Sequence, residues 1–429
     1  MRRRRRWWGV YQVSNSAAVL RGHRRLLAGR RSGTRVNRTV VLLGLTSLLT
    51  DISSEMVLTV LPLYLVYVGG FSPLAFGLID GIYNGAAAIV RLAGGYIGDR
   101  WSRHKEVAAT GYGISAVCKL LLLTVGTAVS AIGAVVLLDR AGKGIRTAPR
   151  DAMISLATPK EELGTAFGVH RAMDTTGAML GPLLAFGLLA LAPLAFHSVF
   201  LVSFCIAIIG VAVLVLFVRP RSAAVDSGEP APAPTLKGAF GLLRIARYRA
   251  LLIAAGALSL ATASDAFVFL VLQEELDLGA SLFPLLFVGS AGTYMVLAVP
   301  MGRLADRLGR GRVLLGGYGL LLAVYLTLLS PASGWIMLAA ALGLLGAYYA
   351  ATDGVLMALG SAVVPETLRG SGLALLGTTV SIARLVASVA FGALWTVLGA
   401  DAALACFAGA LAVAGVVTAV VLARAATRP

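Results

Sequence analysis

Charged residues are scarce in this sequence. Asp, Glu, Lys and Arg make up 13% of its 429 residues, whereas 58% are hydrophobic and the mean hydropathy is +0.86. A soluble domain carries about a quarter charged residues, so folding in water would leave most of this apolar surface uncovered. The composition therefore excludes an ordinary soluble domain and predicts a polytopic membrane protein.

Cysteine, histidine and nucleotide-binding motifs are also few or missing. The three cysteines, Cys118, Cys205 and Cys406, lie far apart in apolar segments without CxxC spacing, so we interpret them as packing residues. The four histidines form no cluster with the spacing of a metal site. A GxxxxGKS/T phosphate loop is absent, which excludes an ATP-driven pump. We expect no cofactor, no metal and no enzymatic activity.

Acidic residues are absent from residues 1–38, which contain twelve arginines. Such a run can bind nucleic acid or anionic lipid, but we favour a plain cytoplasmic tail or an extension from an upstream start codon. A cleavable signal peptide does not fit, because no small-residue cleavage site follows a short apolar core. We therefore predict no nucleic-acid partner and a tail that helps to keep the N-terminus inside the cell.

Long apolar segments are abundant. A helix needs about 20 apolar residues to cross the hydrocarbon core of a bilayer. Twelve such segments can be drawn, and we number them as spans one to twelve: 39–67, 74–98, 107–128, 131–152, 163–189, 196–218, 249–272, 281–303, 312–330, 334–357, 371–397 and 402–423. Loops after even-numbered spans carry Lys or Arg, whereas loops after odd-numbered spans carry neither. This alternation predicts an even number of spans and cytoplasmic N- and C-termini.

One polar segment, 219–248, separates the first six spans from the last six. It is rich in Pro, Ala, Ser and charge, which is typical of a flexible linker. The predicted organisation is a basic cytoplasmic tail (1–38), an N-terminal bundle of six helices (39–218), a cytoplasmic linker and a C-terminal bundle of six helices (249–424).

The two halves share sequence motifs. GYIGDRWSRHK at 95–105 aligns with GRLADRLGRGR at 302–312, and TPKEELGTAFG at 158–168 aligns loosely with VPETLRGSGLA at 364–374. Both pairs have nearly the same offset and occupy matching places in the predicted topology, which makes chance an unlikely explanation. Two related halves predict a transporter built from repeats around a central site.

These motifs resemble the major facilitator superfamily, whose signature Gly-x-x-x-Asp-Arg-x-Gly-Arg-(Arg/Lys) lies between spans two and three. The first copy departs from the signature by a serine in place of one glycine and by an inserted histidine; it holds Gly95, Asp99, Arg100, Arg103 and Lys105. The second copy is closer and holds Gly302, Asp306, Arg307, Gly309 and Arg310. The resemblance covers residues 39–424 and implies an all-α membrane protein of twelve transmembrane helices in two bundles.

The resemblance also implies a gating role for these charges. An aspartate at the cytoplasmic mouth can pair with arginine and with the N-terminal end of a helix of the other half, and such contacts form when this side is closed. The role falls on Asp99 and Arg103, with Asp151 as a candidate partner. The remaining residues of the two copies that we assign to gating are Arg100, Asp306, Arg307 and Arg310. The alternative is that the arginines only set the topology.

Span four contains LDRAGKGIRTAPRD, 138–151, which resembles the family's Arg-x-x-x-Gly signature through Arg140 and Gly144. In the family this arginine is linked to proton transfer. A structural alternative is open, because Asp139 and Lys143 are one helical turn apart and could neutralise each other. Lys119 of span three has no evident local partner.

Span five contains GVHRAMDTTGAMLGPLLA, 168–185. Its spacing resembles a signature of antiporter members, with alanine in place of the last glycine, and the helix-packing residues are Gly168, Gly177, Gly181 and Pro182. Small residues allow close helix packing, and a Gly-Pro pair can bend a helix. This signature favours export by proton exchange. Together the motifs also resemble a prokaryotic subgroup of the superfamily, which indicates a mechanism and not a cargo.

Acidic residues inside predicted spans are the best candidates for function, because water-free surroundings disfavour the ionised carboxyl and allow it to load and release a proton. Asp51 and Glu55 share one helical face, and we expect Asp265 to be their counterpart in span seven. The full set assigned to proton coupling and the substrate cavity is Asp51, Glu55, Arg140, Asp265, Asp353, His170 and Asp174. A structural pair of Arg171 with Asp174 is an equal alternative for span five. We rank Asp80 and Arg91 of span two lower.

The sequence thus predicts a proton-coupled secondary transporter of the cell inner (cytoplasmic) membrane that moves a small solute by alternating access, with efflux by antiport favoured. Proton-symport uptake and a transporter-like receptor or scaffold are the alternatives. The interior acids weakly favour a cationic or neutral cargo. The expected partners are the solute, protons and the lipid bilayer, and the chain is expected to act as a monomer. The excess of Arg over Lys suggests a GC-rich, bacterial genome.

Overall fold

The structure is a computed structural model that describes residues 37–86, 103–159, 162–219, 241–331, 334–365 and 368–427. The chain separates into two units, Met1–Asn37 and Arg38–Pro429. The predicted basic tail and most of the predicted linker lie outside the described residues.

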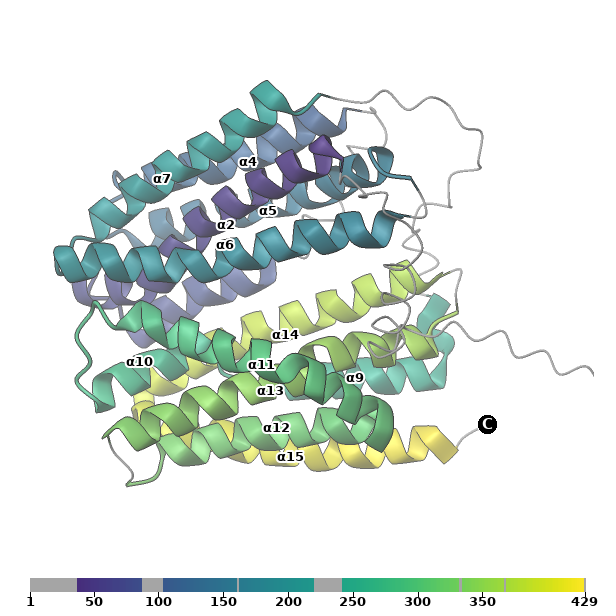
Figure 1. Ribbon diagram of the computed structural model, residues 1–429. Helices are drawn as coiled ribbons and strands as arrows, with labels where there is room; N and C mark the ends of the chain where they lie inside the picture. Colours follow the sequence, from purple (N-terminus) through teal and green to yellow (C-terminus); the bar gives the residue numbers. More distant parts are fainter. Residues whose placement is uncertain are drawn as a thin grey trace, which may run out of the picture. The chain divides into compact units, whose positions relative to one another are not determined.

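The first half of the second unit is helical throughout its described residues, apart from short connections (Figure 1). A helix satisfies its own backbone hydrogen bonds, which is what a segment surrounded by hydrocarbon requires. Its helices are α2 (Arg38–Leu63, continued by the π-helical turn Tyr64–Val68), a helix over 73–86, α4 (His104–Leu121), α5 (Val129–Leu156), α6 (Leu163–Leu191) and α7 (Phe196–Ala212, continued by Val213–Phe217).

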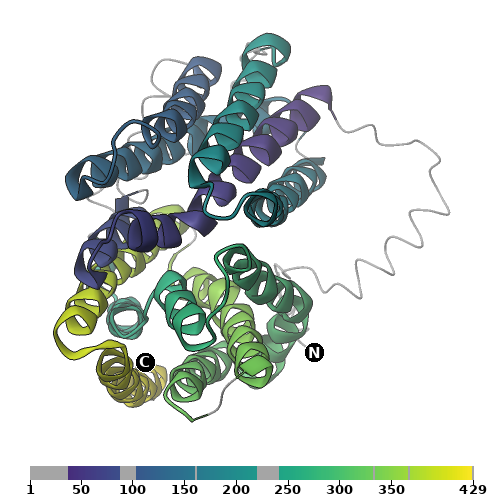
Figure 2. The same ribbon diagram turned by 90° about the vertical axis from the view of Figure 1, so that its left-hand side faces the viewer.

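The second half repeats this architecture. A short 3-10 turn (Leu242–Arg244) precedes its helices, which are α9 (Ala246–Leu260), α10 (Asp265–Glu275), α11 (Phe283–Leu308), α12 (Arg310–Leu328), α13 (Gly334–Val363), α14 (Arg369–Leu398) and α15 (Ala400–Thr427). Figure 2 shows the helices of each half grouped together, with the two groups side by side.

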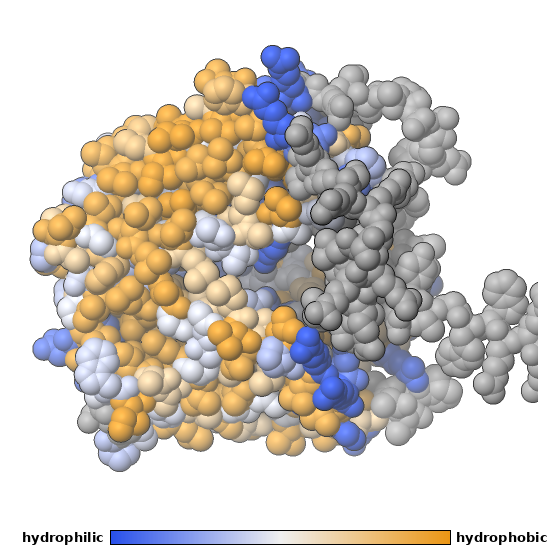
Figure 3. Space-filling model, viewed as in Figure 1, coloured by the Kyte–Doolittle hydropathy of each residue, from blue (hydrophilic) through white to orange (hydrophobic). Residues whose placement is uncertain are grey.

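On the face that Figure 3 shows, apolar residues cover most of both groups, and strongly hydrophilic residues gather mostly at one edge. Nine helices of the described residues are long and apolar enough to cross a membrane. The prediction of an all-helical, multi-pass membrane protein is therefore supported. Each predicted span coincides at least in part with a helix, while the number of twelve spans and the side on which the termini lie stay predictions.

Helix α6 lies directly against α2 because two of its glycines leave room for the neighbouring backbone. A Cβ atom at Gly181 would lie 2.7 Å from the Ile52 carbonyl oxygen and 2.7 Å from the Glu55 Cβ, and Gly177 approaches the Leu48 backbone in the same way. Gly168 differs, since a Cβ there would meet no atom within 4 Å. Of the three glycines in the predicted packing signature, two therefore face a helix.

Span seven, which the sequence predicts as one continuous helix, is broken between α9 and α10. The Tyr325 hydroxyl holds the break: it accepts a hydrogen bond from the Ala263 amide (2.8 Å) and donates one to the Ala261 carbonyl (3.3 Å). Ser264 starts α10 as its N-cap by accepting a bond from the Ala266 amide. Side-chain partners thus satisfy the backbone groups that the break exposes.

The helix over 73–86 packs against α14 and joins the two halves. A Cβ at Gly81 would lie 3.0 Å from the Leu385 carbonyl, so the two backbones approach closely. The Leu74 amide donates to the Thr396 hydroxyl over 2.9 Å. A second seam between the halves runs between α6 and α11. These two seams position the candidate site between them.

Candidate functional site

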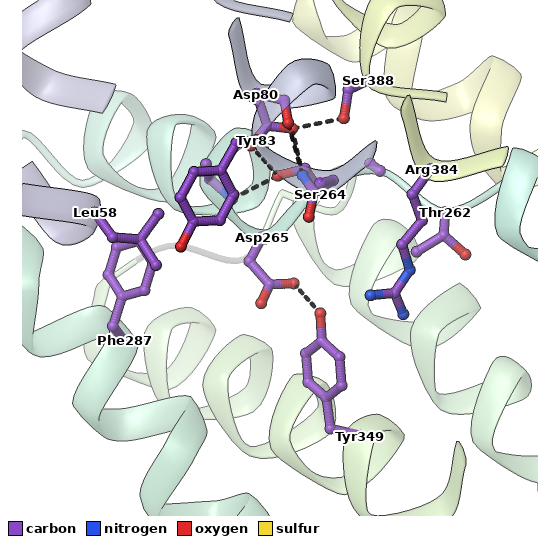
Figure 4. Close-up of a pocket in the computed structure, with 13 residues that line it drawn as sticks. Leu58, Asp80, Tyr83, Thr262, Ser264, Asp265, Phe287, Tyr349, Arg384 and Ser388 are labelled. Carbon is purple, nitrogen blue, oxygen red and sulfur yellow. Dashed lines mark hydrogen bonds between the residues drawn. The ribbon is translucent and has the colours of Figure 1, made fainter. Parts of the chain in front are cut away.

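A cavity of about 110 Å³ lies between the two halves, beside the break in span seven (Figure 4). We call it the inter-bundle cavity. Its lining residues from the first half are Leu58, Asp80, Tyr83 and Asn84, and those from the second half are Thr262, Ala263, Ser264, Asp265, Ala266, Phe287, Tyr349, Arg384 and Ser388. Both halves therefore supply polar and aromatic side chains to one space, as a site served by two moving bundles requires.

Asp80 connects the two halves through its carboxylate. One oxygen accepts a hydrogen bond from the Ser264 hydroxyl (2.9 Å), and the other accepts from Ser388 (2.5 Å) and from the Asn84 amide (3.2 Å). Ser264 begins α10 and Ser388 belongs to α14, so one carboxylate of the first half holds two helices of the second. The low rank that the sequence gives Asp80 misses this role, because both cross-half partners are more than 180 residues away.

Asp265 and Arg384 bring opposite charges to the inter-bundle cavity. The Asp265 carboxylate accepts a hydrogen bond of 2.7 Å from the Tyr349 hydroxyl. Arg384 makes no hydrogen bond or ion pair with any described residue, and its Nε atom is buried without a partner. Sequence reasoning overlooked Arg384, although an arginine within the apolar run of span eleven was the available signal.

A second polar site lies inside the first half, around Asp139. Its carboxylate binds the Lys119 ammonium at 2.7 Å and the Arg140 guanidinium through two nitrogens. Arg140 also stacks on the Tyr83 ring, 4.0 Å from its centroid. The suggested pair of Asp139 with Lys143 is therefore wrong: Lys119, on the facing helix α4, takes that place because tertiary packing brings it closer than the neighbour one turn away. The partner of Lys119, unknown from the sequence, is Asp139.

Asp51 faces a carboxyl from another helix. Asp174 of α6 lies within hydrogen-bonding reach of it, and Arg146 lies 3.9 Å away. Two carboxyls can share a hydrogen bond only when one holds a proton. Glu55, one turn along α2, has no hydrogen bond or ion pair from its carboxyl to any described side chain; Lys143 is the basic residue with the largest electrostatic effect on it.

His170 sits in a polar network close to this carboxyl pair. Its Nε2 atom lies 3.0 Å from the Ser47 hydroxyl, which also contacts the Tyr112 hydroxyl at 3.1 Å. Arg150 donates weakly to the same serine (3.4 Å) and lies 3.9 Å from Asp174. His170 is buried, so it is not a surface residue in this conformation.

The predicted gating residues are only partly described. Asp99 and Arg100 lie outside the described residues, as does Arg91, and Arg307 is exposed. Arg103 pairs with its neighbour Glu106 (3.8 Å), and Asp151 pairs with the adjacent Arg150 (2.9 Å). The predicted contact of Asp151 with the first motif copy is therefore not among the described interactions.

The second motif copy is described in full. Asp306 pairs with Arg310 (3.5 Å), whose guanidinium also donates to the Ala358 carbonyl of α13 over 3.1 Å. Asp353, predicted for the substrate cavity, is exposed on α13 and does not line the inter-bundle cavity. Among the residues that the structure describes, no group of His, Cys, Asp and Glu could hold a metal ion.

Comparison with known proteins identifies a family. The sequence profile of the Major Facilitator Superfamily matches residues 43–292 and 261–429. An uncharacterized MFS-type transporter of Methanocaldococcus jannaschii is 34% identical over 376 residues, which cover 84% of this chain and 89% of that protein. An uncharacterized protein of Mycobacterium bovis is 32% identical over 154 residues, 36% of this chain and 37% of that protein.

Solved transporters share the fold at low sequence identity. The nucleoside transporter NupG superposes with a TM-score of 0.75 at 16% identity, covering 90% of this chain and 99% of that one. The POT family transporter PepTSo gives a TM-score of 0.72 at 11% identity and covers 92% of this chain and 99% of that one. At these identities the likeness establishes the fold and leaves the cargo open.

Proposed function

This chain belongs to the Major Facilitator Superfamily, and we propose that it is a proton-coupled secondary transporter that exports a small solute by alternating access. Its family makes it a multi-pass membrane transporter and not an enzyme. The coupling ion, the direction and the site residues are our proposal. We take it to act as a monomer with twelve spans in the cytoplasmic membrane, with both termini inside.

The observation that carries the proposal is the inter-bundle cavity. A solute held there touches both halves, because Asp80 and Tyr83 come from one and Asp265 and Arg384 from the other. Relative movement of two halves around such a site is how transporters built from repeats expose it first to one side and then to the other. The Asp80 hydrogen bonds to Ser264 and Ser388 keep the halves together at one end.

Proton coupling is supported by the carboxyl pair of Asp51 and Asp174. The pair joins α2 to α6, and α6 in turn lies against α11 of the other half. A proton between two carboxyls favours their contact, whereas its loss leaves two like charges that repel each other. Protonation of the pair would therefore change the packing of α6, which forms one of the two seams between the halves.

Export is the favoured direction because of the Gly-Pro pattern in α6. Gly177 and Gly181 allow the close approach of α6 to α2 that brings Asp174 to Asp51. The antiporter-like signature of the sequence and the proposed proton-carrying pair thus lie on the same helix. Proton-symport uptake is the alternative, and flux direction separates the two.

Flux measured in proteoliposomes tests the proposal. The purified protein would be reconstituted with a compound panel of cations, anions, neutral solutes and zwitterions at equal concentration on both sides, and a pH gradient would then be imposed. Antiport moves the transported compound into the acidic compartment, whereas symport moves it out of that compartment.

Two comparisons make the result specific. Collapse of the gradient with nigericin should abolish the net flux, and an Asp401→Asn variant, altered at an exposed aspartate of α15, should behave like the wild type. Flux that is equal with and without the pH gradient would refute proton coupling. The absence of flux for every compound would favour a receptor or scaffold.

A further inference from the structure

Arg384 is a partly buried cation without a partner among the described residues. It lies in α14 where this helix borders the inter-bundle cavity, and its Nε atom has neither a hydrogen bond nor contact with solvent. Burying a charged group without compensation is costly, so natural proteins pair such groups or reserve them for ligands and ions. The guanidinium opens onto the inter-bundle cavity (Figure 4). It therefore presents donors to an acceptor that the chain itself does not supply.

Asp265 is the matching anion on the same cavity. One of its oxygens accepts from Tyr349, and the structure shows no further hydrogen bond to this carboxylate from any described residue. Figure 4 shows the Asp265 carboxyl and the Arg384 guanidinium facing the same space, with Tyr349 between them. They form no ion pair with each other, so each keeps capacity for a third group.

Asp80 cannot serve as the ligand group in this conformation. Its two oxygens already accept three hydrogen bonds from Ser264, Ser388 and Asn84. The cavity therefore offers one carboxylate with a single hydrogen bond, that of Asp265, and one guanidinium without a partner among the described residues. Aromatic and apolar side chains, those of Tyr83, Phe287 and Leu58, form part of its remaining walls.

We propose that the inter-bundle cavity binds a small zwitterion, whose ammonium group is held by Asp265 and whose carboxylate is held by Arg384. This inference rests on the proposed transport function and names its class of cargo. A guanidinium binds a carboxylate through two parallel hydrogen bonds, and an ammonium binds an aspartate as a compact donor. A solute with one charge would leave either Asp265 or Arg384 without a partner of opposite charge, and a site built to bind a polar group discriminates strongly against ligands that lack it.

Binding to the purified wild-type protein in lipid nanodiscs tests the charge pattern directly. The probes are three amino acids, each with the two analogues that keep only one of its charges. They are alanine with ethylamine and propanoate, 4-aminobutanoate with propylamine and butanoate, and phenylalanine with phenethylamine and 3-phenylpropanoate. At least one zwitterion should bind and should do so at least about tenfold more tightly than both of its analogues.

Charge-removing variants assign the two ends of the ligand. Arg384→Gln should weaken binding of that zwitterion at least about tenfold and bring its affinity to that of the amine analogue. Asp265→Asn should lower the affinity for the same zwitterion to that of the acid analogue for the wild type. Matched controls are Arg303→Gln and Asp401→Asn, which alter exposed residues away from the cavity and should bind like the wild type. If Arg384→Gln does not fold, Arg384→Lys, which keeps the charge and loses the planar fork, should still bind more weakly than the wild type.

The outcomes are separable. Three results would overturn the zwitterion proposal. They are equal binding of a single-charge analogue, no binding of any zwitterion, and wild-type affinity in both cavity variants. Since binding is measured without a pH gradient, a zwitterion that binds but is not moved by the gradient would refute proton-coupled transport and leave the cargo class standing. If the gradient drives a compound of another charge class, the zwitterion proposal is overturned and proton-coupled transport stands.

Discussion

The Lys119 ammonium lies 2.7 Å from an oxygen of the Asp139 carboxylate, and the two side chains are only 3% and 14% exposed. Asp139 also binds Arg140, so one acid neutralises two buried bases from neighbouring helices. Removal of one member of a buried ion pair leaves the other charge without compensation, and this loss outweighs the modest net stability of the intact pair. The loss of Asp139 therefore leaves two bases without an acid, whereas the loss of Lys119 leaves Asp139 paired with Arg140.

Asp139→Asn should destabilise the protein more than Lys119→Met. The first change leaves both Lys119 and Arg140 uncompensated and should cost on the order of 3–5 kcal/mol, whereas the second leaves Asp139 with Arg140. Thermal unfolding in detergent, with Asp401→Asn as control, measures both. A larger loss for Lys119→Met would contradict the geometry.

The hydrogen bonds between Asp80 and the second half can be tested by accessibility. Asp80→Ala removes the acceptor of two bonds to the other half, and each bond to a charged group is worth about 1.5–3 kcal/mol. Since about 1.4 kcal/mol is a tenfold change in an equilibrium, the seam between the halves should open at least roughly tenfold more often.

A cysteine at Phe76 reports this opening, because Phe76 is buried in the seam with its ring 4.8 Å from that of Phe267. In a Phe76→Cys background with the exposed Cys205 and Cys406 replaced by serine, a membrane-impermeant maleimide should react several-fold faster when Asp80 is alanine. The Asp401→Ala change in the same background is the control. Unchanged labelling would show that Asp80 does not hold the halves together.

The proton-carrying role should separate Asp51 from Glu55. Asp51→Asn removes one carboxyl of the pair with Asp174, so gradient-driven flux should fall to the level without a gradient, while downhill exchange continues. Glu55→Gln should retain the response, because its carboxyl has no acidic partner at hydrogen-bonding distance. Both are measured in proteoliposomes. Loss of the response in Glu55→Gln alone would assign the proton to Glu55 instead.

The glycines of α6 should differ in their tolerance of a single methyl group. Gly181→Ala places a Cβ 2.7 Å from the α2 backbone and should cost about 1–3 kcal/mol, as overpacked interiors do. Gly168→Ala meets no neighbour and should be neutral or slightly stabilising through helix propensity. Melting temperatures in detergent compare the two. Equal melting temperatures would show that α2 and α6 adjust freely.

The sequence alone led to the membrane class, the helical content and the family, which the structure and the comparisons support, and to the two-part repeat, which stays a prediction. These features depend on composition and on patterns within one segment, because hydrocarbon surroundings demand long apolar helices whatever their neighbours are. The spacing of Gly177 and Gly181 likewise predicted close helix packing, although it did not show that the neighbouring helix is α2. Sequence reasoning also selected Asp51 and Asp265, since an acid in an apolar run stands out by itself.

Only the tertiary structure decided which groups meet. Asp139 binds Lys119 on another helix, 20 residues away, and not Lys143 one turn along; Asp80 reaches Ser388, 308 residues away. Sequence spacing shows contacts of three or four residues within a helix, whereas contacts between helices depend on how each helix is rotated and where it crosses its neighbours. The break in span seven and the open guanidinium of Arg384 follow from those contacts. For that reason the fold could be predicted from segments, but the cavity and its free charges could not.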